Sequence, residues 1–176
     1  MHIRFSTAVG LPVQEEHARS SCAAVRGVLL HPDTGKIEGF FVAVPGFLHA
    51  EERFLQTMDI LHWGKSIRIR DENVLIPVGD VIRLERLLEE RRPVLGQRIV
   101  SEGGVSLGTC KDIQFDTKQF QLEWIFPRRM LRWGRAIPAS SIVEVRSDAV
   151  VVREAVLLQE TAEKTTLLPG VDLVGG

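Results

Sequence analysis

The stretch that decides the fold is Leu95–Phe126, LGQRIVSEGGVSLGTCKDIQFDTKQFQLEWIF. Its apolar residues alternate with polar ones, as at Phe120, Leu122 and Trp124, and this period of two is typical of half-buried strands. Two glycines at 103–104 supply the positive φ angles of a tight hairpin connection. Short strands at such close spacing favour a small antiparallel β-barrel.

The same pattern occurs earlier in the chain. At a constant displacement of 85 residues, Val25–Leu30 falls on Cys110–Phe115, and residues 37–41 fall on 122–126 without a gap. The apolar positions match while most polar ones differ, as expected of two units that share a core but not a surface. The sequence therefore predicts a duplicated, mainly β chain with two tandem small antiparallel β-barrels joined by one α-helix.

The predicted boundaries follow from this repeat. The first, more diverged barrel occupies 1–79, a linker helix 80–93, the second barrel 94–154, and a C-terminal extension or tail 155–176. The helix is predicted from an apolar stripe and from an Asp80 N-cap, with the stripe formed by Val81, Leu84, Leu87 and Leu88. Two interpretations of the stripe stay open: it packs in the groove between the barrels, or it associates with a second copy to form a homodimer.

Several motifs resemble the PRC-barrel family. Residues 107–113 read Leu-Gly-x-x-x-Asp-Ile and 137–142 read Ile-Pro-Ala-Ser-Ser-Ile, within a match that covers 94–153. The family takes its name from the H subunit of the photosynthetic reaction centre and includes the C-terminal barrel of the ribosome maturation factor RimM. The resemblance implies a small β-barrel that works by binding partners. The first copy departs from it, since Gly27 stands where Asp112 stands in the second.

Composition narrows the functional classes. The formal net charge of −1 argues against binding of nucleic acid through overall charge. Two cysteines without clustered histidines indicate neither a disulfide framework nor a metal site, and Cys110 is predicted to be a buried apolar residue. No apolar run reaches the roughly 18 residues that span a bilayer. We therefore expect a cytoplasmic protein, soluble or peripheral to a membrane, without catalytic residues, cofactor or metal.

A cluster of basic and apolar residues between two strands of the second copy is the candidate site, formed by Arg128, Arg129, Met130, Arg132, Trp133 and Arg135. Arginine pairs with carboxylates and phosphates, and tryptophan stacks on flat groups. The candidate partners are an acidic protein surface, RNA phosphates or an anionic lipid surface. The alternative is a connecting loop whose arginines are solvated or paired with Glu123 and Glu144.

From these observations we predict a non-catalytic protein-binding adaptor or scaffold built from tandem barrels, acting at a membrane-associated complex. The alternative is a ribosome-assembly or RNA-associated factor that uses the arginines of 128–135. The sequence names neither the partner nor the oligomeric state.

Overall fold

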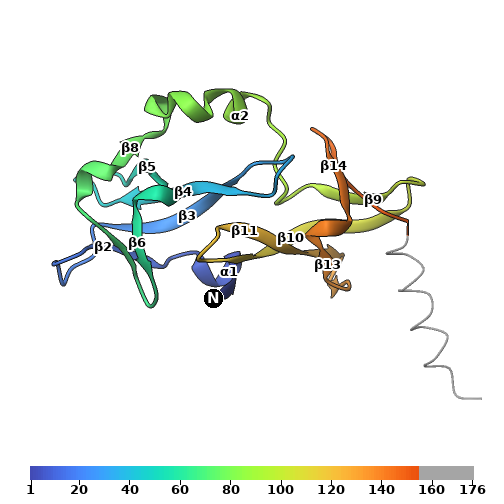
Figure 1. Ribbon diagram of the computed structural model, residues 1–176, viewed down its shortest axis with the longest axis horizontal. Helices are drawn as coiled ribbons and strands as arrows, with labels where there is room; N and C mark the ends of the chain where they lie inside the picture. The colour runs from blue at the N-terminus through green and yellow to red at the C-terminus, as the bar shows by residue number, and fades with distance from the viewer. Residues whose placement is uncertain (155–176) are drawn as a thin grey trace, which may run out of the picture.

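The computed structural model describes residues 1–154, which form two β-sheets lying side by side along the long axis of the molecule (Figure 1). This confirms the prediction of a mainly β chain. Residues 155–176, predicted as a C-terminal extension or tail, lie outside the described part.

The first sheet contains seven strands in the order β6-β7-β2-β3-β4-β5-β8. Strand β2 pairs with β3 antiparallel and with β7 parallel, and neither edge strand of this path pairs with the other. The strands are β2 (Pro12–Glu15), β3 (Ala23–Leu30), β4 (Ile37–Val44), β5 (Glu51–Gln56), β6 (Ile60–Trp63), β7 (Ile67–Ile69) and β8 (Leu75–Pro77), with 3-10 turns η1 (Thr57–Asp59) and η2 (Glu72–Val74).

The second sheet contains eight strands, six of them in the order β12-β11-β10-β9-β15-β14. In addition, β1 pairs with β10 and β13 pairs with β11. The strands are β1 (His2–Arg4), β9 (Arg98–Ser101), β10 (Ser106–Asp116), β11 (Gln121–Arg129), β12 (Arg132–Trp133), β13 (Ile137–Pro138), β14 (Ile142–Val145) and β15 (Ala149–Val152), with a 3-10 turn η5 (Ala139–Ser141).

The two sheets share one pairing register in their long hairpins. Val28 pairs with Phe40 in the first sheet, and Ile113 pairs with Ile125 in the second, at positions 85 residues further along. The register shifts that mark β-bulges also coincide, between Val25 and Gly27 in β3 and between the equivalent residues 110 and 112 in β10. Equivalent positions in the two sheets can therefore be compared residue by residue.

The tips of these two hairpins meet at equivalent residues. Lys36 forms a β-bridge with Gln121, its own counterpart at the displacement of 85. On either side, the Ile37 N–H donates to the Phe120 carbonyl at 2.7 Å, and the N–H of residue 122 donates to the carbonyl of residue 35 at 2.8 Å. These two bonds exchange when the sheets are exchanged, so the contact has the form of an isologous dimer interface within one chain.

A single hydrophobic core runs through both sheets, rather than one core in each of two barrels. Fully buried side chains of the first sheet, including Phe40 and Ile67, belong to the same cluster as Ile113 and Phe115 of the second. The Phe40 and Phe115 rings are 5.8 Å apart between centroids. Each half is too small to bury its apolar surface well alone, and a shared core removes more of that surface from water.

The N-terminal residues lie on the second sheet, which corrects their predicted place in a first domain 1–79. Strand β1 pairs with β10, and the short helix α1 (Phe5–Ala8) follows it against the same strand. The Asp112 carboxylate fixes this segment, since it accepts bonds from the Ser6 backbone N–H at 3.0 Å and from the Ser6 hydroxyl at 2.6 Å. Asp112 is buried, so these bonds replace lost hydration.

The linker is not the single helix predicted for 80–93. It consists of 3-10 turns η3 (Val78–Asp80) and η4 (Ile82–Leu84), followed by α2 (Glu85–Glu89). Val81 has φ −83° and ψ 64°, outside the α region, and this interrupts helical hydrogen bonding. Leu84, not Asp80, precedes α2, and it makes no side-chain cap.

Packing explains the interruption of the linker. Val81 and Leu84 are both buried in a small cluster with Phe54 of the first sheet. Further along, Leu87 and Leu88 of α2 line a hollow of about 260 Å³ with residues of β3 and β10. The apolar stripe is thus divided between two contacts on the protein itself, because tertiary burial overrides helix propensity here. No helix within residues 1–154 is long and apolar enough to cross a bilayer.

Candidate interaction surface

The candidate site is a hairpin at the end of the second sheet, formed by β11 and β12 (Figure 1). Arg128 pairs with Trp133 and Arg129 with Arg132, so only Met130 and Leu131 form the turn. Met130 takes a positive φ of 53°. A two-residue turn of this kind leaves no space for its side chains to fold back, and we call residues 128–135 the basic hairpin.

The tip of the basic hairpin is apolar and exposed. Met130 and Leu131 are 93% and 85% exposed, and Trp133 is 53% exposed. Isolated exposed apolar residues are common on protein surfaces, but three at one hairpin form a patch with a specific shape. Because the patch is convex, it fits a partner that offers a pocket.

Arg128 and Trp133 interact across the hairpin. The Arg128 guanidinium carbon lies 5.6 Å from the centroid of the Trp133 ring, within the range of a cation–π contact. The Arg128 Nε is buried and has no hydrogen-bond partner within residues 1–154. An arginine held in this way keeps donors available for an acceptor on another molecule.

The base of the hairpin is rigid. Gly108 of β10 has φ 112°, and a Cβ built there would lie 2.7 Å from the Arg128 carbonyl oxygen, so only glycine permits this approach. The Gly134 N–H donates to the Pro127 carbonyl at 2.9 Å. The predicted bulge at Gly108 is confirmed by the register shift between Ser106 and Gly108.

The carboxylates suggested as partners of these arginines are paired elsewhere. Glu123 contacts the His2 Nδ1 at 2.7 Å, and Glu144 pairs with the Arg146 Nε at 2.9 Å. Neither Arg129 nor Arg132 forms an ion pair in the part of the chain that the structure describes, and both are exposed. The pairing alternative with Glu123 and Glu144 is therefore wrong, and the hairpin carries excess positive charge.

The structure brings five of the six predicted residues together on this hairpin, from Arg128 to Trp133, while Arg135 lies just beyond β12. The prediction omitted Leu131, which the structure places at the tip. Its position between Met130 and Arg132 was the available signal, since a two-residue turn exposes both of its residues.

Groups suited to catalysis do not gather in the described residues. Among residues 1–154 no three His, Cys, Asp or Glu side chains lie close enough together to hold a metal ion. Cys110 is fully buried, as predicted, and burial raises the pKa of its thiol to about 12. A thiol of this kind remains protonated at neutral pH.

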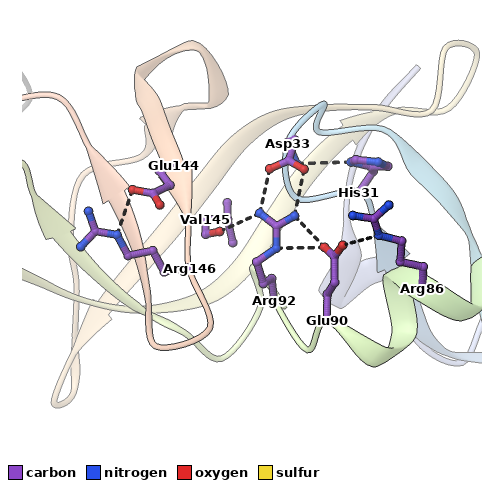
Figure 2. A network of polar contacts seen from close by, with 8 residues as sticks. All are labelled: His31, Asp33, Arg86, Glu90, Arg92, Glu144, Val145 and Arg146. Carbon is purple, nitrogen blue, oxygen red and sulfur yellow. Dashed lines mark hydrogen bonds and ion pairs between the residues drawn. The ribbon is translucent and has the colours of Figure 1, made fainter.

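A second structural feature, absent from the sequence predictions, lies between the sheets. Arg92, just after α2, forms a bidentate pair with Asp33 at 2.8 and 2.9 Å and also bonds Glu90 at 2.7 Å (Figure 2). Its Nη1 donates to the Val145 carbonyl at 3.1 Å. These hydrogen bonds hold the pKa of Asp33 and of Glu90 below their ordinary values. We call this arrangement the Arg92 clamp, because it ties the first sheet to β14 of the second.

Comparison with protein-family models and with curated proteins finds no match for this chain.

Proposed function

We propose that the chain is a non-catalytic adaptor of the PRC-barrel type, which binds another protein through the basic hairpin. The exposed apolar tip flanked by arginines is the observation that carries this proposal. Membership of the PRC-barrel type rests on the sequence motifs of 94–153. The identical strand registers and bulges of the two sheets support an origin by tandem duplication.

The chemistry of the tip favours a protein partner over RNA. Met130 and Leu131 are aliphatic and project furthest, whereas single-stranded nucleic acid is held by aromatic stacking platforms. Trp133 already has Arg128 near its ring. The expected partner therefore offers an apolar pocket for the tip and carboxylates at its rim for Arg129 and Arg132, in a cytoplasmic, membrane-associated complex.

The test compares three forms of the full-length protein after cross-linking in native cells, each with and without ribonuclease. They are the wild type, Met130→Glu/Leu131→Glu, and a control with Val105→Glu, which changes another half-exposed turn residue. We expect a discrete protein to be captured by the wild type and the control, independently of nuclease, and lost with the tip variant.

Two results would contradict this proposal. Capture that persists in the tip variant would show that the contact lies elsewhere. Capture of ribosomal particles that disappears with nuclease and weakens steeply with salt would favour the RNA-associated alternative, because phosphate contacts release counterions. Arg129→Glu/Arg132→Glu would then be the variant with the larger effect.

A further inference from the structure

A hollow of about 400 Å³ opens between the two sheets, on the side of the Arg92 clamp. The turn at residues 31–35 of the first sheet forms one wall, and η5 with β14 of the second forms the other. Apolar side chains line most of it: Leu30, Pro32, Val94, Leu122, Ala139, Ile142, Val143 and Val145. Its volume lies within the range of small-molecule sites.

The equivalent position on the other side of the pseudo-symmetric contact is filled by aromatic rings. Trp63 lies 5.0 Å from Phe40 and 5.7 Å from Phe115, measured between ring centroids. Phe120 completes the group at 6.1 Å from Trp63. We call this group the aromatic junction. Its members come from β4, β6, β10 and the turn before β11.

Each of these rings has a smaller counterpart on the side of the hollow. Val145 corresponds to Trp63 through the matching pairs of β6–β7 and β14–β15, in which Trp63 faces Ile67 and Val145 faces Val150. At the displacement of 85, Leu30 corresponds to Phe115 and Gly35 to Phe120. The smaller residues 30, 35 and 145 all line the hollow. The hollow is thus the space that aromatic rings occupy in the other half.

The backbone at the turn shows that this difference lies in the side chains. Gly35 and Phe120 both take left-handed conformations, with φ 69° and 51°. Such a conformation is uncommon for a bulky residue, and Phe120 keeps it while its ring packs in the aromatic junction. At the hollow the same turn carries glycine, which leaves the space open.

The Arg92 clamp keeps the walls of the hollow apart. It bonds Asp33 on one wall and the Val145 carbonyl on the other, as Figure 2 shows. Arg92 belongs to the linker, so it serves only this side of the molecule. Walls that are tied in this way do not collapse onto each other, and the site is formed before any ligand enters.

The polar groups at the hollow restrict the charge of a ligand. Asp33 and Glu144 contribute carboxylates, and Ser140 contributes a hydroxyl. A buried anionic ligand would meet like charge, whereas a ring with an N–H group finds acceptors. From these contacts we propose that the hollow binds a small molecule with a flat aromatic ring that is neutral or cationic and carries a hydrogen-bond donor. This site is independent of the basic hairpin.

The test uses the full-length protein labelled with ¹⁵N and free indole as the probe, with backbone amide shifts as the readout. We expect saturable shifts at Gly35, Ser140 and Val145 at millimolar indole. Tryptamine should bind at least as well as indole, and indole-3-acetate more weakly. Val145→Trp, which places in the hollow the residue found at the equivalent position, should weaken binding at least tenfold. Leu30→Phe is the second filling variant if Val145→Trp does not fold.

Val105→Trp is the matched control, since it adds the same ring at a half-exposed turn outside the hollow. It should bind indole as the wild type does. Absence of saturable shifts in the wild type would overturn the proposal. So would unchanged indole binding in a folded filling variant, or shifts confined to other parts of the protein. None of these results depends on partner capture by the basic hairpin.

Discussion

The aromatic junction and the hollow occupy equivalent places in one pseudo-symmetric molecule, yet one is packed and the other open. Their strands share pairing registers, bulges and the conformation of the hairpin turn. They differ in three side chains, at which Trp63, Phe115 and Phe120 face the smaller Val145, Leu30 and Gly35. The comparison shows that strand pairing sets the frame, whereas ring size decides whether the frame encloses a core or a site.

The largest effect is expected from Trp63→Val, which gives the aromatic junction the residue found at the hollow. Trp63 is buried against three rings, so its loss removes apolar burial and leaves a cavity. We expect the free energy of unfolding to fall by about 3 kcal/mol. Urea denaturation monitored by circular dichroism measures the change.

The control for this change is Trp124→Val, because Trp124 is exposed on β11. That variant should lose less than about 1 kcal/mol. Equal losses in the two variants would show that the aromatic junction contributes no more than an exposed ring, and the comparison of the two halves would lose its energetic basis.

Asp112→Ala tests the second asymmetry, the docking of the N-terminal segment on one sheet only. Gly27 occupies the equivalent position and binds no such segment. Truncation leaves the Ser6 N–H and hydroxyl without their acceptor, so we expect the free energy of unfolding to fall by about 2 kcal/mol. Urea denaturation again measures it, together with amide hydrogen exchange of residues 2–8.

A double-mutant cycle with Ser6→Ala separates this contact from the other bonds of Asp112, including that from the Ile113 N–H. Strictly additive losses in the two single variants would mean that the Ser6 hydroxyl contributes nothing through Asp112.

A smaller effect is expected from Arg92→Gln, which opens the clamp at the hollow. At pH 7 the melting temperature should fall by roughly 2–4 °C. Arg92 lowers the pKa of Asp33 and Glu90, so its contribution is present above the ordinary carboxylate pKa and is lost as pH falls below it. The difference between variant and wild type should therefore shrink between pH 7 and pH 3.

Thermal melts at both pH values check this, with Arg146→Gln as the control. Arg146 pairs with Glu144 at the surface, where an exposed ion pair contributes little, so its variant should melt as the wild type does. A difference for Arg92→Gln that grows toward acid pH would contradict the role assigned to the clamp.

The smallest effect is expected from Cys110→Val, which places in the second sheet the residue found at Val25. Both side chains are fully buried at equivalent positions, so the free energy of unfolding should change by about 1 kcal/mol or less. In the wild type, burial also raises the pKa of both the Cys110 and Cys22 thiols. A maleimide reagent should modify Cys110 only after unfolding, and mass spectrometry of native and denatured samples will show whether it does.

The sequence by itself determined the local structure. Period-2 alternation predicted the strands of the second sheet, the glycines at 103–104 its first hairpin, and the displacement of 85 residues the positions that later proved equivalent in register. It also indicated the burial of Cys110 and most of the basic hairpin. These features depend on neighbours in the chain or on alternation along a strand, which a sequence displays directly.

Only the tertiary structure decided where the pieces meet. Helical spacing in 80–92 was a real signal, but burial of Val81 and Leu84 against Phe54 broke the helix. The N-terminal residues crossed to the second sheet because Asp112, distant in sequence, offered acceptors to Ser6. The hollow exists because Leu30, Gly35 and Val145 meet across two sheets. Such contacts join residues far apart in the chain, and local pattern carries no information about which of them will face each other.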